Sequence, residues 1–255
     1  MAILLKDRKL PIKLAEQPLI DAVFEMRFLS SVPASDILPG FLFGKLPGEK
    51  KIESLPVAQV PKPLRDSDPN LQFSPITRLR WSDYVISIGD RSISIGCNYP
   101  YPGWSNFKPA IKRITGLLKE INIFQSISRY SMKYVDLILS TNVEHQISLI
   151  DMDISVAGHK IKNQEFQLRV ELITDNFVNI IQIIPSASAM LLNGEKRCGI
   201  IIDVDTIYNI NDLNIEEVFN GSFDTELEDI HTMNKRMFFD CLNEETIKSL
   251  GPIYD

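Results

Sequence analysis

Two long stretches of the chain alternate apolar and polar residues with the period of two that is typical of β-strands. In residues 18–28, every second residue from Ile20 to Phe28 is apolar, whereas Glu25 and Arg27 between them are charged. Side chains of neighbouring strand residues point to opposite faces, so this pattern predicts one strand with a buried face and a charged face.

Residues 127–138, near the middle of the chain, repeat the pattern. Tyr134 falls on the predicted buried face, and Arg129 and Lys133 fall on the polar face. We therefore expect two long strands of similar design, one in each half of the chain.

A similar series of elements is predicted after each strand. In the first half the series begins with a short or irregular helix capped by Ser35 or Asp36. A proline-rich stretch at 45–70 follows, in which we expect an edge strand near 52–60 but no regular helix. Strands at 71–81, 84–88 and 92–98 come next, and a helix from Ser105 to about 121 closes the series. In the second half these are a short helical turn near 140–146, strands at 153–156, 166–174, 177–184 and 199–208, and a helix from 224 or 225 to about 242.

This order of elements predicts an α+β fold. The strands come in hairpin-spaced runs and do not alternate with helices, which excludes parallel βαβ repeats. We expect two tandem copies of one unit, at 18–123 and 124–255, after an extended lead-in at 1–17. They would form one body with a curved antiparallel sheet and both long helices on one face, as in a duplicated helix-grip or TATA-binding-protein-like saddle. The first strands of the copies would be neighbours.

Charge and composition add limits on location and partners. Residues 1–123 carry 17 basic and 12 acidic residues, a net +5, and residues 124–255 carry 10 and 21, a net −11. The first half is thus the better candidate for an anionic partner, although it also complements the second half. Three scattered cysteines, the lack of a long apolar run and the short apolar stretch at the N-terminus predict a cytoplasmic protein outside the membrane.

The two strand sequences resemble motifs of one protein family. PLIDAVFEMRF at residues 18–28 resembles P-x-V-E-A-V-F-E-I-R-F, and RYSMKYVDLI at residues 129–138 resembles R-I-G-L-R-Y-I-N-R-I. Both motifs belong to an uncharacterised family distributed sporadically among bacteria and archaea. The chain departs from the second motif at Ser131, Lys133 and Asp136, where the family has Gly, Arg and Asn. The departure at Asp136 puts in doubt any polar contact that the Asn makes in the family.

The resemblance implies no established activity. The sporadic distribution of the family implies genes carried on mobile or defence islands. We therefore expect a role in a defence or toxin-neutralising system.

Catalytic and cofactor signatures are missing from the sequence. It contains no G-x-S-x-G motif, no glycine-rich phosphate loop and no histidine pair at zinc-ligand spacing, so we expect no metal and no cofactor. A non-catalytic role is favoured, and an enzyme of unfamiliar type stays the open alternative. Asp203 and Asp205 would point to the same side of a strand, about 7 Å apart, as in a cation site. The preferred interpretation is that both carboxylates lie on a solvated strand face.

The charged faces of the two motif strands form the main candidate site. The candidate binding residues are Glu25, Arg27, Arg129 and Lys133 on those faces, together with Tyr134 and Asp136 of the second strand. One interpretation is structural: Asp21, Glu25 and Arg27 of the first strand would face Arg129 and Lys133 of the second, and the opposite charges would pair and fix the register. The other is a binding surface on which Arg129 and Lys133 contact anions.

A second candidate surface is basic and would bind RNA or DNA. It combines two arginines on one strand with the tryptophan and lysines of the following helix: Arg78, Arg80, Trp104, Lys108 and Lys112. A lysine stripe is also what any solvated helix shows, and the chain as a whole is acidic. We therefore expect first a non-catalytic module that binds another protein, as a monomer or weak homo-oligomer. A nucleic-acid-binding module is the alternative.

Overall fold

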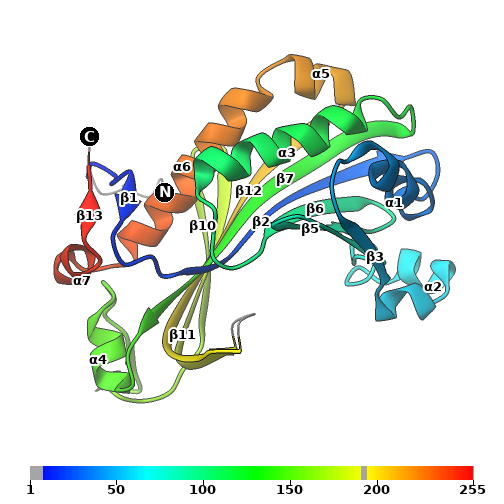
Figure 1. The fold of residues 1–255 in the computed structure, drawn as a ribbon. Helices are drawn as coiled ribbons and strands as arrows, with labels where there is room; N and C mark the ends of the chain where they lie inside the picture. Colours follow the sequence, from blue (N-terminus) through cyan, green and yellow to red (C-terminus); the bar gives the residue numbers. More distant parts are fainter. Residues whose placement is uncertain (1–7, 191–193, 255) are drawn as a thin grey trace. The chain divides into compact units, whose positions relative to one another are not determined.

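A nine-stranded antiparallel sheet organises the fold. The computed structural model describes residues 8–190 and 194–254, and the strand order in the sheet is β10-β11-β12-β7-β2-β6-β5-β4-β3. The two motif strands, β2 (Leu19–Ser30) and β7 (Phe124–Leu139), are neighbours at the centre, as predicted (Figure 1). The α+β class is confirmed, whereas the proposed duplication and the helix-grip likeness stay predictions.

The other strands and the helices follow in chain order. The remaining strands of the sheet are β3 (Lys50–Ser54), β4 (Thr77–Trp81), β5 (Tyr84–Ile88), β6 (Ser92–Cys97), β10 (Leu168–Thr174), β11 (Phe177–Met190) and β12 (Lys196–Leu213). The α-helices are α1 (Ala34–Lys45), α2 (Lys62–Ser67), α3 (Trp104–Leu118), α4 (Val143–Ser148), α5 (Ile215–Asn220), α6 (Phe223–Asp240) and α7 (Glu244–Ser249), and a 3-10 helix spans Pro56–Gln59. Two small sheets pair β1 (Lys13–Leu14) with β13 (Pro252–Ile253), and β8 (Ser155–Val156) with β9 (His159–Lys160).

The chain folds into two compact units that do not coincide with its two halves. Unit 1 comprises the described residues of 1–22, 133–207 and 229–255, and unit 2 comprises residues 23–132 and 208–228. Strands β2, β7 and β12 and helix α6 each contribute residues to both units.

In unit 1 the later turns of α6 pack on one face of the strands. The Asn234 side-chain amide donates a hydrogen bond of 2.8 Å to the carbonyl oxygen of Val204 on β12. Strands β10 and β11 form a hairpin through a two-residue turn, in which Asp175 has a φ of 53°. The core of this unit is made of apolar side chains such as Ile202, Ile230 and Phe239.

In unit 2 helix α3 lies along one face of β2 and β7 (Figure 1). Phe24 of β2 is buried against Tyr130 of β7 and Phe223 at the start of α6, with ring centroids 6.0 and 6.3 Å away. The β4–β5 turn has a φ of 49° at Ser82, close to the value at Asp175 in the β10–β11 turn. The opposite face of these strands is polar and carries the candidate site.

Several predicted elements differ in the structure. Helix α2 forms inside the proline-rich stretch where no regular helix was expected, because Pro63 stands in its first turn, where a missing donor costs least. Helix α1 is a continuous helix of 12 residues despite its internal Pro39, and β4 begins at Thr77 instead of 71.

The predicted helix caps at Ser35 or Asp36 and at Ser105 are also wrong. The residues at those N-cap positions are Pro33 and Gly103, and neither makes a side-chain cap hydrogen bond. In α1 the N–H of Ala34 instead bonds to the carbonyl oxygen of Asp90 at 3.1 Å, so a neighbouring turn supplies the acceptor.

Candidate functional site

Two arginines and a glutamate form a cluster on the polar face of unit 2, which we call the arginine cluster. Arg27 donates from Nε to Glu25 Oε1 at 2.7 Å, and Arg129 Nη2 lies 3.6 Å from the same oxygen. The cross-strand pairing of Glu25 with Arg129 that the sequence suggested is therefore present. The guanidinium of Arg27 also lies 4.2 Å from the ring centroid of Phe73, in the segment that precedes β4. The three charged side chains are 21–27% exposed, so solvent reaches them.

Strand pairing places further side chains beside this cluster. Directly paired residues of neighbouring strands point to the same face, so the register defines two rows across the sheet. The first row is Glu25, Ser94, Ser87, Arg78 and Glu53, and the second row is Val23, Gly96, Val85, Arg80 and Lys51. We call these ten residues, together with Arg27 and Arg129, the open face.

The centre of the open face consists of short side chains. Ser94, Ser87, Gly96 and Val85 are partly exposed and lie between the arginine cluster and the arginines of β4. The alternate residues of the same strands point into the core on the α3 side, where Ile86 and Ile95 are almost completely buried. The open face is therefore a polar strip of serine and glycine with arginine on both sides.

The ion pair of Lys133 lies in unit 1 and is made with β12, whereas the sequence predicted a pairing with the first motif strand. Lys133 Nζ forms an ion pair with Asp203 Oδ2 at 2.9 Å, and the Gln182 amide donates to the same oxygen at 3.2 Å. Asp203 is only 8% exposed, so the expectation that it lies on a solvated face is wrong: β12 is an interior strand, and side chains of β7 and β11 contact the carboxylate.

Asp21 shares this environment. Desolvation raises the pKa of Asp21 above its usual value, and the hydrogen bond with the Ala22 backbone and the charge of Lys133 act in the opposite direction. Among residues 8–190 and 194–254, no group of three or more His, Cys, Asp or Glu side chains is arranged to hold a metal ion.

Two of the predicted site residues are buried away from solvent. The Tyr134 hydroxyl lies 3.0 Å from His231 Nδ1 of α6, and both residues belong to unit 1. Asp136 is 5% exposed, and its desolvation, followed by the charge of Asp203, raises its pKa well above the usual range. Neither residue is available for a surface contact, and sequence alternation predicts this, because Asp136 lies two residues after Tyr134 and shares its strand face.

The predicted nucleic-acid surface is largely ion-paired. Lys108 Nζ lies 2.7 Å from Glu228, to which the Trp104 indole also donates at 2.9 Å. Lys112 lies 2.6 Å from Asp224. These acidic residues at the start of α6 reduce the positive potential that α3 offers to phosphates.

The arginines of this surface, Arg78 and Arg80, lie instead on β4 in the open face. Arg80 forms an ion pair of 3.1 Å with Glu53 of β3. The structure therefore places the strand residues and the helix residues of the predicted nucleic-acid surface on different faces of unit 2.

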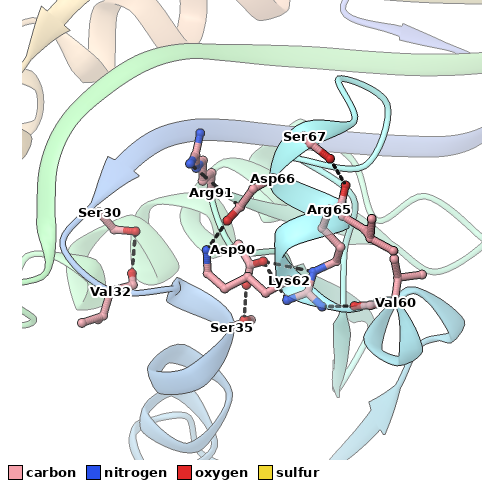
Figure 2. A network of polar contacts seen from close by, with 11 residues as sticks. Ser30, Val32, Ser35, Val60, Lys62, Arg65, Asp66, Ser67, Asp90 and Arg91 are labelled. Carbon is pink, nitrogen blue, oxygen red and sulfur yellow. Dashed lines mark hydrogen bonds and ion pairs between the residues drawn. The ribbon is translucent and has the colours of Figure 1, made fainter.

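A buried polar network that the sequence analysis did not identify holds the α1 and α2 ends together (Figure 2). The Asp90 carboxylate accepts hydrogen bonds from Arg65 Nε and Nη2 at 3.1 and 2.9 Å, and from the Ser35 hydroxyl at 2.5 Å. Arg65 Nη1 also donates to the carbonyl oxygen of Val60 at 2.5 Å. The carboxylate is almost fully buried, and its partners are 25 and 55 residues away in the sequence, so no local motif identifies it.

Neither the helices of the described residues nor comparison with known proteins identifies the chain further. Over the described ranges, no helix combines the length and the apolar character that a bilayer crossing requires. No protein-family model matches the chain, and the search of curated proteins returned no match. The family resemblance of the strand motifs therefore stays a prediction.

Proposed function

We propose that this chain is a non-catalytic protein-binding module and that the open face of unit 2 is its contact surface. The observation that carries the proposal is the strip of short side chains between two arginine-bearing strands. A partner backbone can approach a strand closely where the side chains are serine and glycine, and flanking arginines supply fixed donors to its polar groups. Arginine is also enriched in protein interfaces relative to the rest of the protein surface.

Burial of the alternate residues supports the same face. The α3 side of these strands is filled by the protein's own core, whereas the open-face residues of β5 and β6 keep part of their surface in solvent. An antiparallel sheet of this kind packs one face on the core and keeps the other face in solvent, where a partner can bind.

The test is affinity capture from the native host after nuclease treatment, with wild-type protein and a variant blocked on the open face. Ser87→Tyr adds a large side chain to the centre of the strip, and Glu171→Tyr makes the same kind of change on an exposed position of β10. The proposal expects a stoichiometric protein partner with the wild-type and Glu171→Tyr proteins, and its loss with Ser87→Tyr. Equal capture by all three proteins contradicts it.

We also infer from the motif resemblance that the partner belongs to a defence or toxin-neutralising system. The test is genetic: deletion of this gene should expose the host to toxicity from a neighbouring gene, or should change phage plating. Growth and plating that do not differ from those of the wild-type host contradict this part of the proposal.

The nucleic-acid alternative uses the same experiment. It expects recovered RNA or DNA without a protein partner, and binding that weakens on substitution of Arg78 and Arg80 and with added salt. The ion pairs of Lys108 and Lys112 make this the weaker candidate.

A further inference from the structure

The arginine cluster resembles an occupied anion site, because one carboxylate oxygen contacts two arginines from neighbouring strands. Glu25 Oε1 lies 2.7 Å from Arg27 Nε and 3.6 Å from Arg129 Nη2. Guanidinium groups are planar and present several N–H donors, so they bind carboxylates strongly and often with two donors at once. Here the carboxylate that they bind belongs to the protein itself.

Phe73 fixes one side of this site. The Arg27 guanidinium lies 4.2 Å from the centroid of the Phe73 ring, an arrangement in which the aromatic face attracts the cation. A guanidinium held in this way loses less conformational freedom on binding an anion. The Arg27 side chain is 26% exposed, so solvent reaches it.

The charge of the whole open face favours an acidic occupant. It carries five basic side chains and two acidic ones, a formal excess of three positive charges, although the chain has a net charge of −6. The charged residues are Arg27, Lys51, Arg78, Arg80 and Arg129 against Glu25 and Glu53. Long-range attraction would therefore steer a negatively charged segment to this face.

The side chains of the face distinguish a protein from a nucleic acid. None of the twelve open-face residues is aromatic, and the nearby Phe73 ring already contacts Arg27. Single-stranded nucleic acids bind such sheets by stacking bases on exposed aromatic rings. The serine hydroxyls of Ser87 and Ser94 instead offer hydrogen bonds suited to a peptide.

We propose that an acidic, Glu- or Asp-rich segment of the partner protein binds the arginine cluster, and that Glu25 is an internal competitor whose carboxylate the segment displaces. The inference rests on the proposed function, since it names the chemistry of the partner at the same face. Glu25 keeps the two arginines paired and positioned when no partner is bound. It also lowers the affinity for weakly acidic segments, because they must replace a carboxylate that is already in place.

The test is the binding of a fluorescein-labelled oligoglutamate peptide, measured by anisotropy at low and at physiological salt. Glu25→Gln removes the competing charge and keeps the side-chain shape, so the peptide should bind about threefold more tightly or better. Arg129→Gln and Arg27→Gln each remove a charged donor and should weaken binding roughly tenfold. Arg169 is an exposed arginine of β10 in unit 1, so Arg169→Gln is the matched control and should leave the affinity unchanged.

Three results would overturn the inference: no binding to wild type or Glu25→Gln, weaker binding on Glu25→Gln, or tighter binding to an oligothymidylate of equal charge. A melting curve for each variant separates loss of the site from loss of the fold. If the peptide fails to bind but Ser87→Tyr still abolishes capture of a host protein, the acidic segment is wrong while the proposed function stands.

Discussion

Asp136 shows how one buried carboxyl links stability to pH. It lies on β7 two residues after Tyr134, and desolvation together with the charge of Asp203 raises its pKa well above the usual range. The folded state therefore binds a proton at Asp136 more tightly than the unfolded state does. Stability is fully present below the unfolded pKa and falls as the pH rises from there through the folded pKa.

Asp136→Asn should remove this part of the pH dependence. Asn has nearly the same shape and carries no charge, so the variant should match the wild type near pH 4 and be more stable by about 1–3 kcal/mol near pH 8. Urea unfolding at both pH values measures the difference. A variant less stable than wild type at the higher pH would show that the ionised carboxylate makes a favourable contact.

The position matters for the motif resemblance as well. The family has Asn where this chain has Asp136, and this side chain is buried in the structure. A neutral amide is the less costly side chain at a desolvated position. The stability measurement therefore also tests whether this departure from the motif carries an energetic penalty.

At the scale of elements, strands β7 and β12 approach each other closely at Gly199. A Cβ atom added there would overlap the carbonyl oxygen of Ile138 and would lie 3.1 Å from the Cα of Leu139. Since these neighbours are backbone atoms of a central strand, they cannot rotate away as a flexible side chain would.

Gly199→Ala should therefore destabilise the protein by about 1–3 kcal/mol, the usual range for an overpacked core. Gly116→Ala is the control, because Gly116 lies inside α3 with no atom within 4 Å of an added Cβ. That substitution should stabilise by about 0.5–1 kcal/mol through helix propensity. Chemical denaturation gives both values, and equal effects of the two alanines would contradict the close approach.

The Asp90 network connects the turn between β5 and β6 with helices α1 and α2. Asp90→Ala leaves the guanidinium of Arg65, which is 11% exposed, without its carboxylate partner, and should cost about 3 kcal/mol. Asp66→Ala removes a partly exposed carboxylate of α2 that pairs with Lys62 and should cause a much smaller loss. Thermal melting of both variants tests this, and similar losses would mean that Asp90 acts only as a surface charge.

Elements with strong periodicity were predictable from the sequence, and short ones were not. The alternation in 18–28 and 127–138 predicted β2 and β7 with the correct faces, and the apolar stripe predicted α3. Helices α2, α5 and α7 have six residues each, less than two turns, so no apolar stripe distinguishes them. Their ends depend on caps such as Asn214 and Asn243.

The candidate site was predictable only strand by strand. Sequence alternation places Glu25, Arg27 and Arg129 on polar strand faces, but it does not say which strands are neighbours. The serine strip requires the register of β5 and β6, and the burial of Asp203 requires β12 to be an interior strand. Both depend on pairings between distant segments, which local sequence does not encode.

At the scale of the whole molecule, each compact unit is built from segments of both halves of the chain. In unit 2, Phe24 from the first half packs against Tyr130 and Phe223 from the second half. Tyr130 is completely buried. A fragment that ends before β7 therefore loses part of its own core and leaves one edge of β2 unpaired.

Residues 1–123 and 124–255, expressed separately, should each fail to form a native fold. Amide chemical-shift dispersion should be narrow for each fragment and should recover, at least in part, when the two are co-expressed. A fragment that folds alone with wide dispersion would show that the two sequence halves are independent domains, contrary to the division into discontinuous units.

The most direct test of the account locates the partner on the open face. Arginine side chains are labelled with a dicarbonyl reagent in the free protein and in the captured complex, and the labelled sites are quantified by mass spectrometry. Arg80 and Arg129 should be protected by the partner, and Arg169 on β10 should react equally in both states. Protection of Arg169 with unchanged labelling of Arg80 and Arg129 would contradict the assignment of the open face as the binding surface.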